Sequence, residues 1–218
     1  MRQLNGVLPA VVIDNVDPDN LGRVKVRLPQ VDAASGQHGH EIWARIATLM
    51  AGKNQGTWFI PDVNDEVLVA FEAGDMRRPY VIGCLWSGSN PPPETMNASN
   101  NKKLLCSRNG VKITLDDQSG QENFIVETPS GQKITLKDGP GSIEITDSNG
   151  NSVRLGASGI IVSASAKVTI NASQVEINSG AINVNAGIAK FNGVVQCDTL
   201  ISNSVISASY TPGVGNIS

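Results

Sequence analysis

The chain has 218 residues and carries 17 Lys and Arg against 20 Asp and Glu, which gives a net charge of −3. Because the balance is mildly acidic and no basic block is present, we expect no nucleic-acid partner. Three widely spaced cysteines argue against a disulfide framework and indicate synthesis in a reducing cytoplasm. The first residues lack the apolar core of a signal peptide, and no apolar run is long enough to span a bilayer as a helix.

Residues 1–90 have the character of a small all-β domain. Runs of alternating or β-branched apolar residues predict five strands, at residues 7–16, 23–28, 42–47, 66–71 and 79–85. No segment of this part shows helical periodicity, and all three tryptophans lie within it. Five short strands, with a long polar connection after the second, predict a closed five-stranded barrel of the OB type.

A proline-rich stretch separates this domain from a repetitive second half. Residues 90–94 read Asn-Pro-Pro-Pro-Glu, and we assign residues 91–108 to a linker. Over residues 109–207, pairs of apolar residues recur with one residue between them, at intervals that shorten to seven or eight residues. Alternation indicates strands, and repetition at a fixed interval indicates a solenoid. Because each strand could bury only about two or three side chains, we expect a β-helical needle that is stable only when several chains wrap together.

Three segments carry a resemblance to a known family. They are residues 22–29 (GRVKVRLP), residues 61–88, which run from PDVNDEVLVAFEAGD to LWSG, and residues 127–152, which include ETPSGQKITL and IEITDSNGNS. The sequence resembles the central spike proteins of contractile injection systems, a family that includes phage baseplate assembly protein V and the VgrG spikes of type VI secretion. The resemblance implies an all-β protein in which an OB-fold barrel is followed by an intertwined trimeric β-helix needle.

The resemblance also implies a function and a set of partners. The protein would be a structural, non-enzymatic homotrimer that pierces a target-cell membrane at the centre of the baseplate. Because the chain begins at the OB-fold, we expect the hub to be a separate polypeptide. Because it has no histidine after His40, we expect the metal-bearing PAAR-repeat tip to be a separate protein as well. Such a spike is assembled in the bacterial cytoplasm and acts within a phage tail or injection-system particle, whether retained or released.

Two segments are hypotheses for contact with these partners. Arg23, Lys25 and Arg27 alternate along one predicted strand and would share a face, which could contact the hub or a neighbouring subunit. Residues 208–218 break the strand pattern and would form a tip-facing segment. Contacts with the tip protein would come from Tyr210, Pro212, Val214 and Ile217. A solvated face and a frayed tail are the plain alternatives.

Residues of catalytic or metal-binding type are present but favour structural roles. His38 and His40 lie on a polar loop without further ligands near them in sequence. Cys84 lies in an apolar predicted strand, where a small buried residue is expected. Paired carboxylates such as Asp116 and Asp117 lie in turn sequences, where such residues form turns and caps. We therefore expect no catalytic residue, no cofactor and no metal site.

Two other functions are alternatives to a spike. A receptor-binding or fibre protein of the same particle would need an exposed recognition surface near the tip. Tyr210 alone is weak evidence for such a surface. A polysaccharide-degrading β-helix enzyme would need carboxylates along the needle. From residue 155 to residue 218, however, the charged residues are only Lys167, Glu176, Lys190 and Asp198.

Overall fold

The computed structural model describes residues 6–31 and 39–209 of the chain. Apart from the short 3-10 turn η1 (Glu72–Gly74), every element that it shows is a β-strand, so the expected all-β class is confirmed. The chain divides into two compact units, residues 1–167 and residues 168–218. Within the described residues, no helix is long and apolar enough to cross a membrane.

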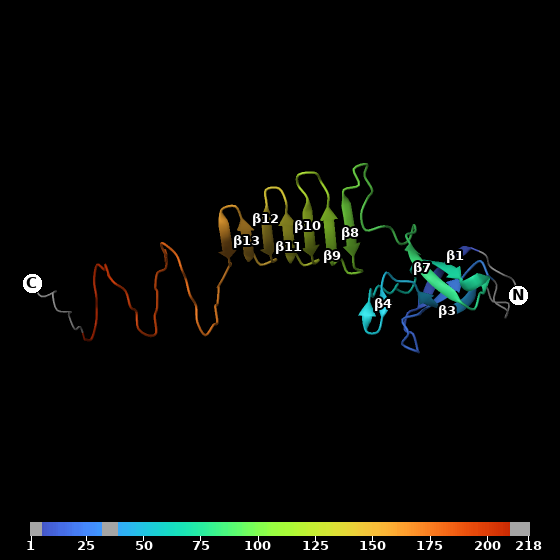
Figure 1. Cartoon of the computed structure of the whole chain (residues 1–218), viewed down its shortest axis with the longest axis horizontal. Helices are drawn as coiled ribbons and strands as arrows, with labels where there is room; N and C mark the ends of the chain where they lie inside the picture. The colour runs from blue at the N-terminus through green and yellow to red at the C-terminus, as the bar shows by residue number, and fades with distance from the viewer. Residues whose placement is uncertain (1–5, 32–38, 210–218) are drawn as a thin grey trace, which may run out of the picture. The chain divides into compact units, whose positions relative to one another are not determined.

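Five strands of the first unit close into a barrel (Figure 1). They are β1 (Val7–Asp14), β2 (Val24–Leu28), β3 (His40–Ile46), β6 (Glu66–Phe71) and β7 (Pro79–Leu85). Their order around the barrel is β1-β2-β3-β7-β6, and β6 pairs back onto β1. All neighbours are antiparallel except β3 and β7, which run parallel. The five-stranded barrel expected from the sequence is confirmed.

Alternation along each strand explains the barrel core. In β2, Val24, Val26 and Leu28 are fully buried, whereas Lys25 and Arg27 face outward. The whole core comprises Ala10, Val12, Val24, Val26, Leu28, Ala44, Val67, Val69, Phe71 and Val81. Full burial of a Val or Leu side chain contributes about 1.5–3 kcal/mol. The barrel therefore holds its own hydrophobic core within one chain.

One carboxylate organises the connection between β1 and β2. Asp17 accepts backbone N–H bonds from Asp19 at 3.1 Å, from Leu21 at 2.9 Å and from Arg23 at 3.1 Å. The Arg23 guanidinium also donates to it, at 2.7 Å. These donors, and the Arg23 side chain above all, hold the pKa of Asp17 well below its usual range. The conformation of this loop therefore depends on an ionised carboxylate.

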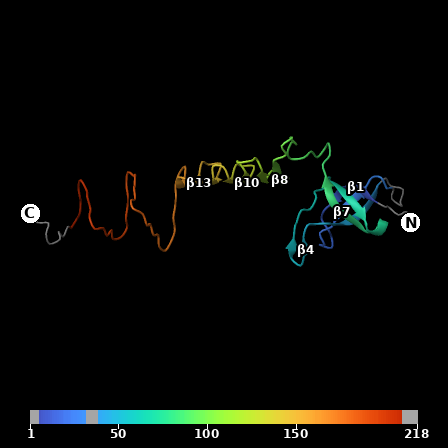
Figure 2. The same cartoon turned by 45° about the horizontal axis from the view of Figure 1, so that its top comes forward.

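Seven further strands of the first unit form one antiparallel sheet. They are β8 (Lys102–Cys106), β9 (Lys112–Asp116), β10 (Asn123–Glu127), β11 (Lys133–Lys137), β12 (Ser142–Thr146), β13 (Ser152–Gly156) and β14 (Gly159–Ser163). Each strand pairs with the next along the chain. Figure 2 shows this sheet close to edge-on, as a single layer. Within one chain this part of the expected needle is a flat sheet, and the winding of three chains stays a prediction.

The second unit continues the apolar repeats without paired strands. Between residues 168 and 209 no strand is assigned, and the backbone is drawn there as a plain trace (Figure 1, orange to red). A strand needs a neighbour for its backbone hydrogen bonds. In this segment a single chain does not supply that neighbour.

The strands differ from the sequence analysis in two places. β8 lies inside residues 91–108, which we assigned to a linker, because Leu104 and Leu105 pair with β9. A short hairpin of β4 (Ala51–Gly52) and β5 (Gln55–Gly56) forms in a Gly-rich stretch for which the sequence predicts no strand. Both pairings arise from contacts between segments, which local alternation does not show.

We expect Asp17→Asn to lower the urea midpoint of the full chain at neutral pH, because an amide cannot replace the charged partner of Arg23. The folded-state pKa of Asp17 is depressed, so its contribution is present above the unfolded carboxyl pKa of about 4. That contribution is lost as the pH falls from about 4 towards the lower folded-state pKa. The difference between variant and wild type should therefore shrink with acidification, as measured by circular dichroism.

Asp117→Asn is the control, because Asp117 is exposed and its side chain accepts no hydrogen bond from any of the described residues. It should leave the midpoint unchanged at every pH. A loss from Asp17→Asn that did not depend on pH would contradict the role of the ionised carboxylate.

Candidate assembly surface

One face of the sheet carries two continuous rows of apolar side chains. In each strand from β9 to β14, two apolar residues separated by one position point to this face, because side chains alternate along a strand. The register sets each of them opposite an apolar residue of the next strand. One row comprises Ile113, Val126, Ile134, Ile145, Val153 and Val162, and the other comprises Leu115, Phe124, Leu136, Ile143, Leu155 and Ile160. We call these residues the apolar face.

The apolar face is uncovered in the single chain. Ile160 is 70% exposed and Leu115 is 48% exposed, whereas Val24 in the barrel core is 0% exposed. Single exposed apolar residues are common, but contiguous apolar surface marks an interaction site. A stable sheet buries one face against a second layer, and the described residues form no such layer here (Figure 2). The sheet therefore requires a partner.

Over β9–β14, the opposite face of the sheet is mainly polar, with Ile125 and Ile161 as its apolar members, and it carries its own ion pairs. Glu144 pairs with Lys137 at 3.2 Å and with Arg154 at 3.4 Å. Such cross-strand pairs stabilise a solvent-facing sheet surface by roughly 0.2–1 kcal/mol each. The sheet thus has one face suited to water and one suited to a hydrophobic core.

Hydrogen bonds within the turn between β12 and β13 keep the two apolar rows in register. Between β12 and β13, the Asp147 carboxylate accepts the backbone N–H of Asn149 at 2.9 Å and of Asn151 at 2.8 Å, and the Asn151 side-chain amide at 2.7 Å. These hydrogen bonds, chiefly from the Asn151 side chain, lower the pKa of Asp147. Gly150 in this turn has a φ of 84°, which suits glycine. Because a slip of one residue would carry the apolar residues to the other face, the turn protects the apolar face.

The same apolar pattern continues into the second unit. Its pairs begin seven residues apart, at residues 168, 175 and 182. All six side chains of these pairs are exposed: Val168, Ile170, Val175, Ile177, Ile182 and Val184. This segment therefore needs a partner for its side chains as well as for its backbone.

Of the basic residues expected to contact a hub, Lys25 and Arg27 lie on the outer side of β2 and Arg23 directly precedes it. All three are ion-paired within the barrel domain. Arg23 pairs with Asp17 at 2.7 Å. Lys25 and Arg27 both pair with Glu41, at 3.2 Å and 2.9 Å. The bond from Arg27, and after it that from Lys25, lowers the pKa of Glu41. Contact of these residues with a hub stays a prediction.

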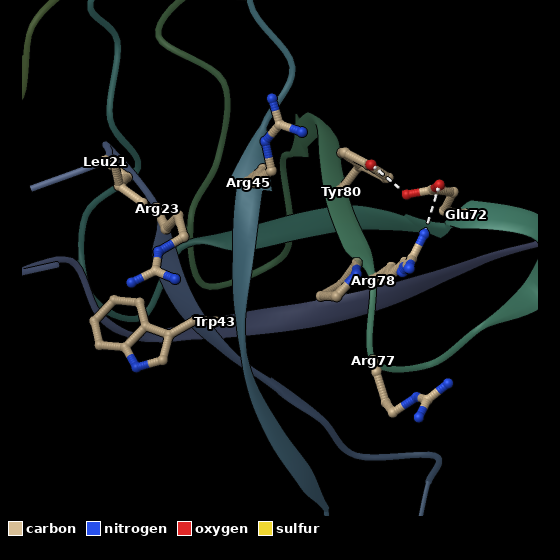
Figure 3. Close-up of a pocket in the computed structure, with 9 residues that line it drawn as sticks. Leu21, Arg23, Trp43, Arg45, Glu72, Arg77, Arg78 and Tyr80 are labelled. Atoms are coloured by element: carbon tan, nitrogen blue, oxygen red, sulfur yellow. Dashed lines mark hydrogen bonds and ion pairs between the residues drawn. The ribbon is translucent and has the colours of Figure 1, made fainter. Parts of the chain in front are cut away.

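Four arginines border a cavity of about 560 Å³ beside β3 and β7 (Figure 3). They are Arg23, Arg45, Arg77 and Arg78. Arg77 pairs with Asp75 at 2.8 Å, and Arg78 pairs with Glu72 at 3.0 Å. The Tyr80 hydroxyl also donates to Glu72, at 2.7 Å, which raises the pKa of Tyr80. Because three of the four guanidinium groups already face a carboxylate, the cavity is a weak candidate for an anion site.

Residues of catalytic type are not brought together in the part of the chain that the structure describes. His40 lies at the start of β3, and Cys84 lies near the end of β7. The expectation that Cys84 is buried is wrong, because the outward end of β7 leaves the residue exposed. Desolvation by the surrounding atoms still raises the pKa of its thiol. Residues 6–31 and 39–209 contain no group of three or more His, Cys, Asp or Glu that could hold a metal ion. The four residues expected to contact a tip protein, Tyr210, Pro212, Val214 and Ile217, lie outside the described residues, as does His38, which the sequence analysis did not assign to a site.

Sequence reasoning missed a second exposed apolar area, on the barrel. Trp58 and Phe59 are exposed beside the β4–β5 hairpin. Two adjacent aromatic residues in a Gly-rich stretch were the signal that could have revealed it, because large aromatic side chains outside predicted strands often serve interfaces.

Two family models match the chain. The type VI secretion system/phage-baseplate injector OB domain matches residues 8–86, which reach from β1 to the end of β7. The phage baseplate V C-terminal trimerisation domain matches residues 123–183, which include β10–β14 and the start of the second unit. The apolar face thus lies largely inside a region similar to a trimerisation domain.

Curated relatives agree with these matches. The type VI secretion system spike protein VgrG3 of Vibrio cholerae is 29% identical over 133 residues, which are 57% of this chain and 13% of the relative. The spike protein VgrG4b of Pseudomonas aeruginosa is 32% identical over 119 residues, 52% of this chain and 15% of the relative. The actin cross-linking toxin VgrG1 of Vibrio cholerae is 28% identical over 131 residues, 56% of this chain and 12% of the relative. The chain spans only a small part of the length of these relatives.

We expect Leu136→Glu to lower the melting temperature of the full chain strongly. The substitution sets a carboxylate in the middle of the apolar face, and an unpaired buried charge costs about 3–5 kcal/mol. Thr146→Glu is the matched control, because Thr146 lies on the polar face, opposite Lys133. Differential scanning calorimetry measures both. Equal effects from the two variants would mean that the apolar face stays open to water.

Proposed function

The chain belongs to the baseplate spike family of phage baseplate V and type VI secretion VgrG proteins, and we propose that it works as a trimeric membrane-piercing needle at the centre of a contractile injection system. In this proposal the needle attaches to a hub protein and carries a separate PAAR-type tip protein. Membership of the family makes it a component of a phage tail or type VI secretion particle. The apolar face is the observation that carries the proposal.

Three copies can satisfy the apolar face together. If each chain turns this face inward, the three sheets enclose one core, and the polar face with its Glu144 ion pairs stays in water. The side chains of the face are about half exposed in one chain, so complete burial contributes about 1 kcal/mol for each. The match to a trimerisation domain over residues 123–183 supports a stoichiometry of three.

The second unit supports a piercing role. Its exposed apolar pairs and unpaired backbone can be satisfied when three chains wind around one axis, which also leaves few free strand edges. From residue 168 to residue 209, the only charged residues are Glu176, Lys190 and Asp198. Few charges must then lose their water when the needle enters a membrane, which lowers the cost of entry.

Hub and tip contacts rest on the chemistry of two surfaces. The outer side of β2 with Arg23, Lys25 and Arg27 is the proposed surface for the hub or a neighbouring subunit. The uncharged segment of residues 208–218 is the proposed seat of the tip protein. We propose no enzymatic activity, and the toxin named in one relative belongs to a protein of which this chain matches 12%. Assembly of the particle would take place in the bacterial cytoplasm.

The solution mass of the purified chain tests the proposal. Light scattering behind size exclusion should give about 69 kDa, three times the 22.9 kDa of one chain. The species should elute early for its mass, because a needle is elongated. A compact species of 22.9 kDa would contradict the trimeric needle, since the apolar face would then be tolerated or covered within one chain.

A further inference from the structure

The barrel has an apolar groove that its own core does not use. A groove of about 1120 Å³ lies between the β4–β5 hairpin and the barrel wall. Six exposed apolar side chains border it: Leu21, Leu49, Met50, Trp58, Phe59 and Ile82. We call these six residues and the space between them the hairpin groove.

The composition of the hairpin groove is that of an interface rather than of ordinary surface. Leu49 is 97% exposed, Trp58 77% and Phe59 71%. Arg45 is the one charged residue among those that line the groove. Interface cores are enriched in aromatic residues and Met and depleted in Lys, Asp and Glu. Several such residues around one hollow indicate a docking site, whereas scattered ones would not.

The groove is held in shape before any partner arrives. The Thr57 N–H donates to the Met50 carbonyl at 3.0 Å, and the Thr48 hydroxyl donates to the Thr57 carbonyl at 2.9 Å. The Trp58 ring lies against Gly22, where an added Cβ would meet it at 3.4 Å. Because the hairpin backbone and the Trp58 ring are already placed, less ordering entropy is lost when the groove is covered.

We propose that the hairpin groove is covered by the barrel of a neighbouring copy of this chain. This inference rests on the proposed trimer. Residues 86–101 connect β7 to β8 in every copy, and the region that matches a trimerisation domain begins at residue 123. When three chains join through their needles, the linkers hold the three barrels close together. Each barrel then meets its neighbours at an effective concentration of about millimolar.

The symmetry of a trimer favours this occupant. In a threefold ring each copy offers one surface to its neighbour and receives a different surface from the other, so the ring closes with every groove filled. Since the groove is lined by a single charged residue, its occupant is an apolar surface. The same barrel presents exposed apolar residues outside the groove, among them Val16 and Val63.

Fluorescence quenching of a single tryptophan tests the contact. The full-length variant Trp43→Phe/Trp86→Phe leaves Trp58 as the only tryptophan. In the trimer, we expect acrylamide to quench Trp58 at least about threefold less than free N-acetyltryptophanamide, because the core of an interface excludes solvent. The full-length variant Trp43→Phe/Trp58→Phe leaves Trp86, which is exposed outside the groove and shows what trimer formation alone does to an exposed tryptophan.

The mass of the same samples separates the two proposals. A trimer in which Trp58 is more strongly protected than Trp86 supports the barrel contact. A trimer in which Trp58 is quenched like the free compound overturns the contact and leaves the trimeric needle standing, with the groove open to another protein. A mass of one chain overturns both.

Discussion

The structure depends on one constraint, which is that the described residues form no second layer over the apolar face of β9–β14. Two rows of Val, Ile, Leu and Phe lie on one side of a single sheet. An isolated layer of this kind is unstable in water because a sheet must bury one face. The strand register and the hydrogen bonds of Asp147 keep both apolar rows on one face, where a partner can cover them together. Assembly is therefore built into the fold of the single chain.

The barrel shows how the same alternation can lead to a self-sufficient unit. β2 and β13 both place apolar side chains at every second position. In the barrel, the parallel pairing of β3 with β7 closes the sheet on itself, so the apolar side becomes an interior. In the sheet that begins at β8, the chain meanders without closing. The closed barrel therefore has a hydrophobic core of its own, whereas the open sheet leaves its apolar side exposed.

Most of the arginines at the sites described are already ion-paired within the chain, so few free charges remain there to bind a charged partner. The Arg23 side chain pairs with Asp17 in the loop after β1, and two further arginines at the cavity of Figure 3, Arg77 and Arg78, pair with carboxylates of their own. The hairpin groove and the apolar face carry almost no charge. Hydrophobic contact thus dominates the surfaces that remain to be covered, as expected for a permanent structural assembly.

The sequence by itself determined the class of fold, the five barrel strands, the apolar pairs of the second half of the chain and the family. These features follow from alternation with a period of two and from local motifs, which are read within a few residues. Phe124 and Leu136 were visible as members of apolar pairs, but only the register showed that they lie side by side on one face. Neighbours distant along the chain decide such contacts.

Only the tertiary structure decided how exposed the paired residues are and which partners the charged ones have. The sequence did not predict β8, because residues 102–106 begin with two lysines and do not alternate between polar and apolar. The strand forms through its pairing with β9. Lys25 and Arg27 have no acidic residue beside them in the sequence, yet both are ion-paired with Glu41 on the next strand. Trp58 could have been a core residue by type, and only the folded hairpin left it in solvent. Burial and ion pairing depend on segments far apart in sequence, which local patterns cannot specify.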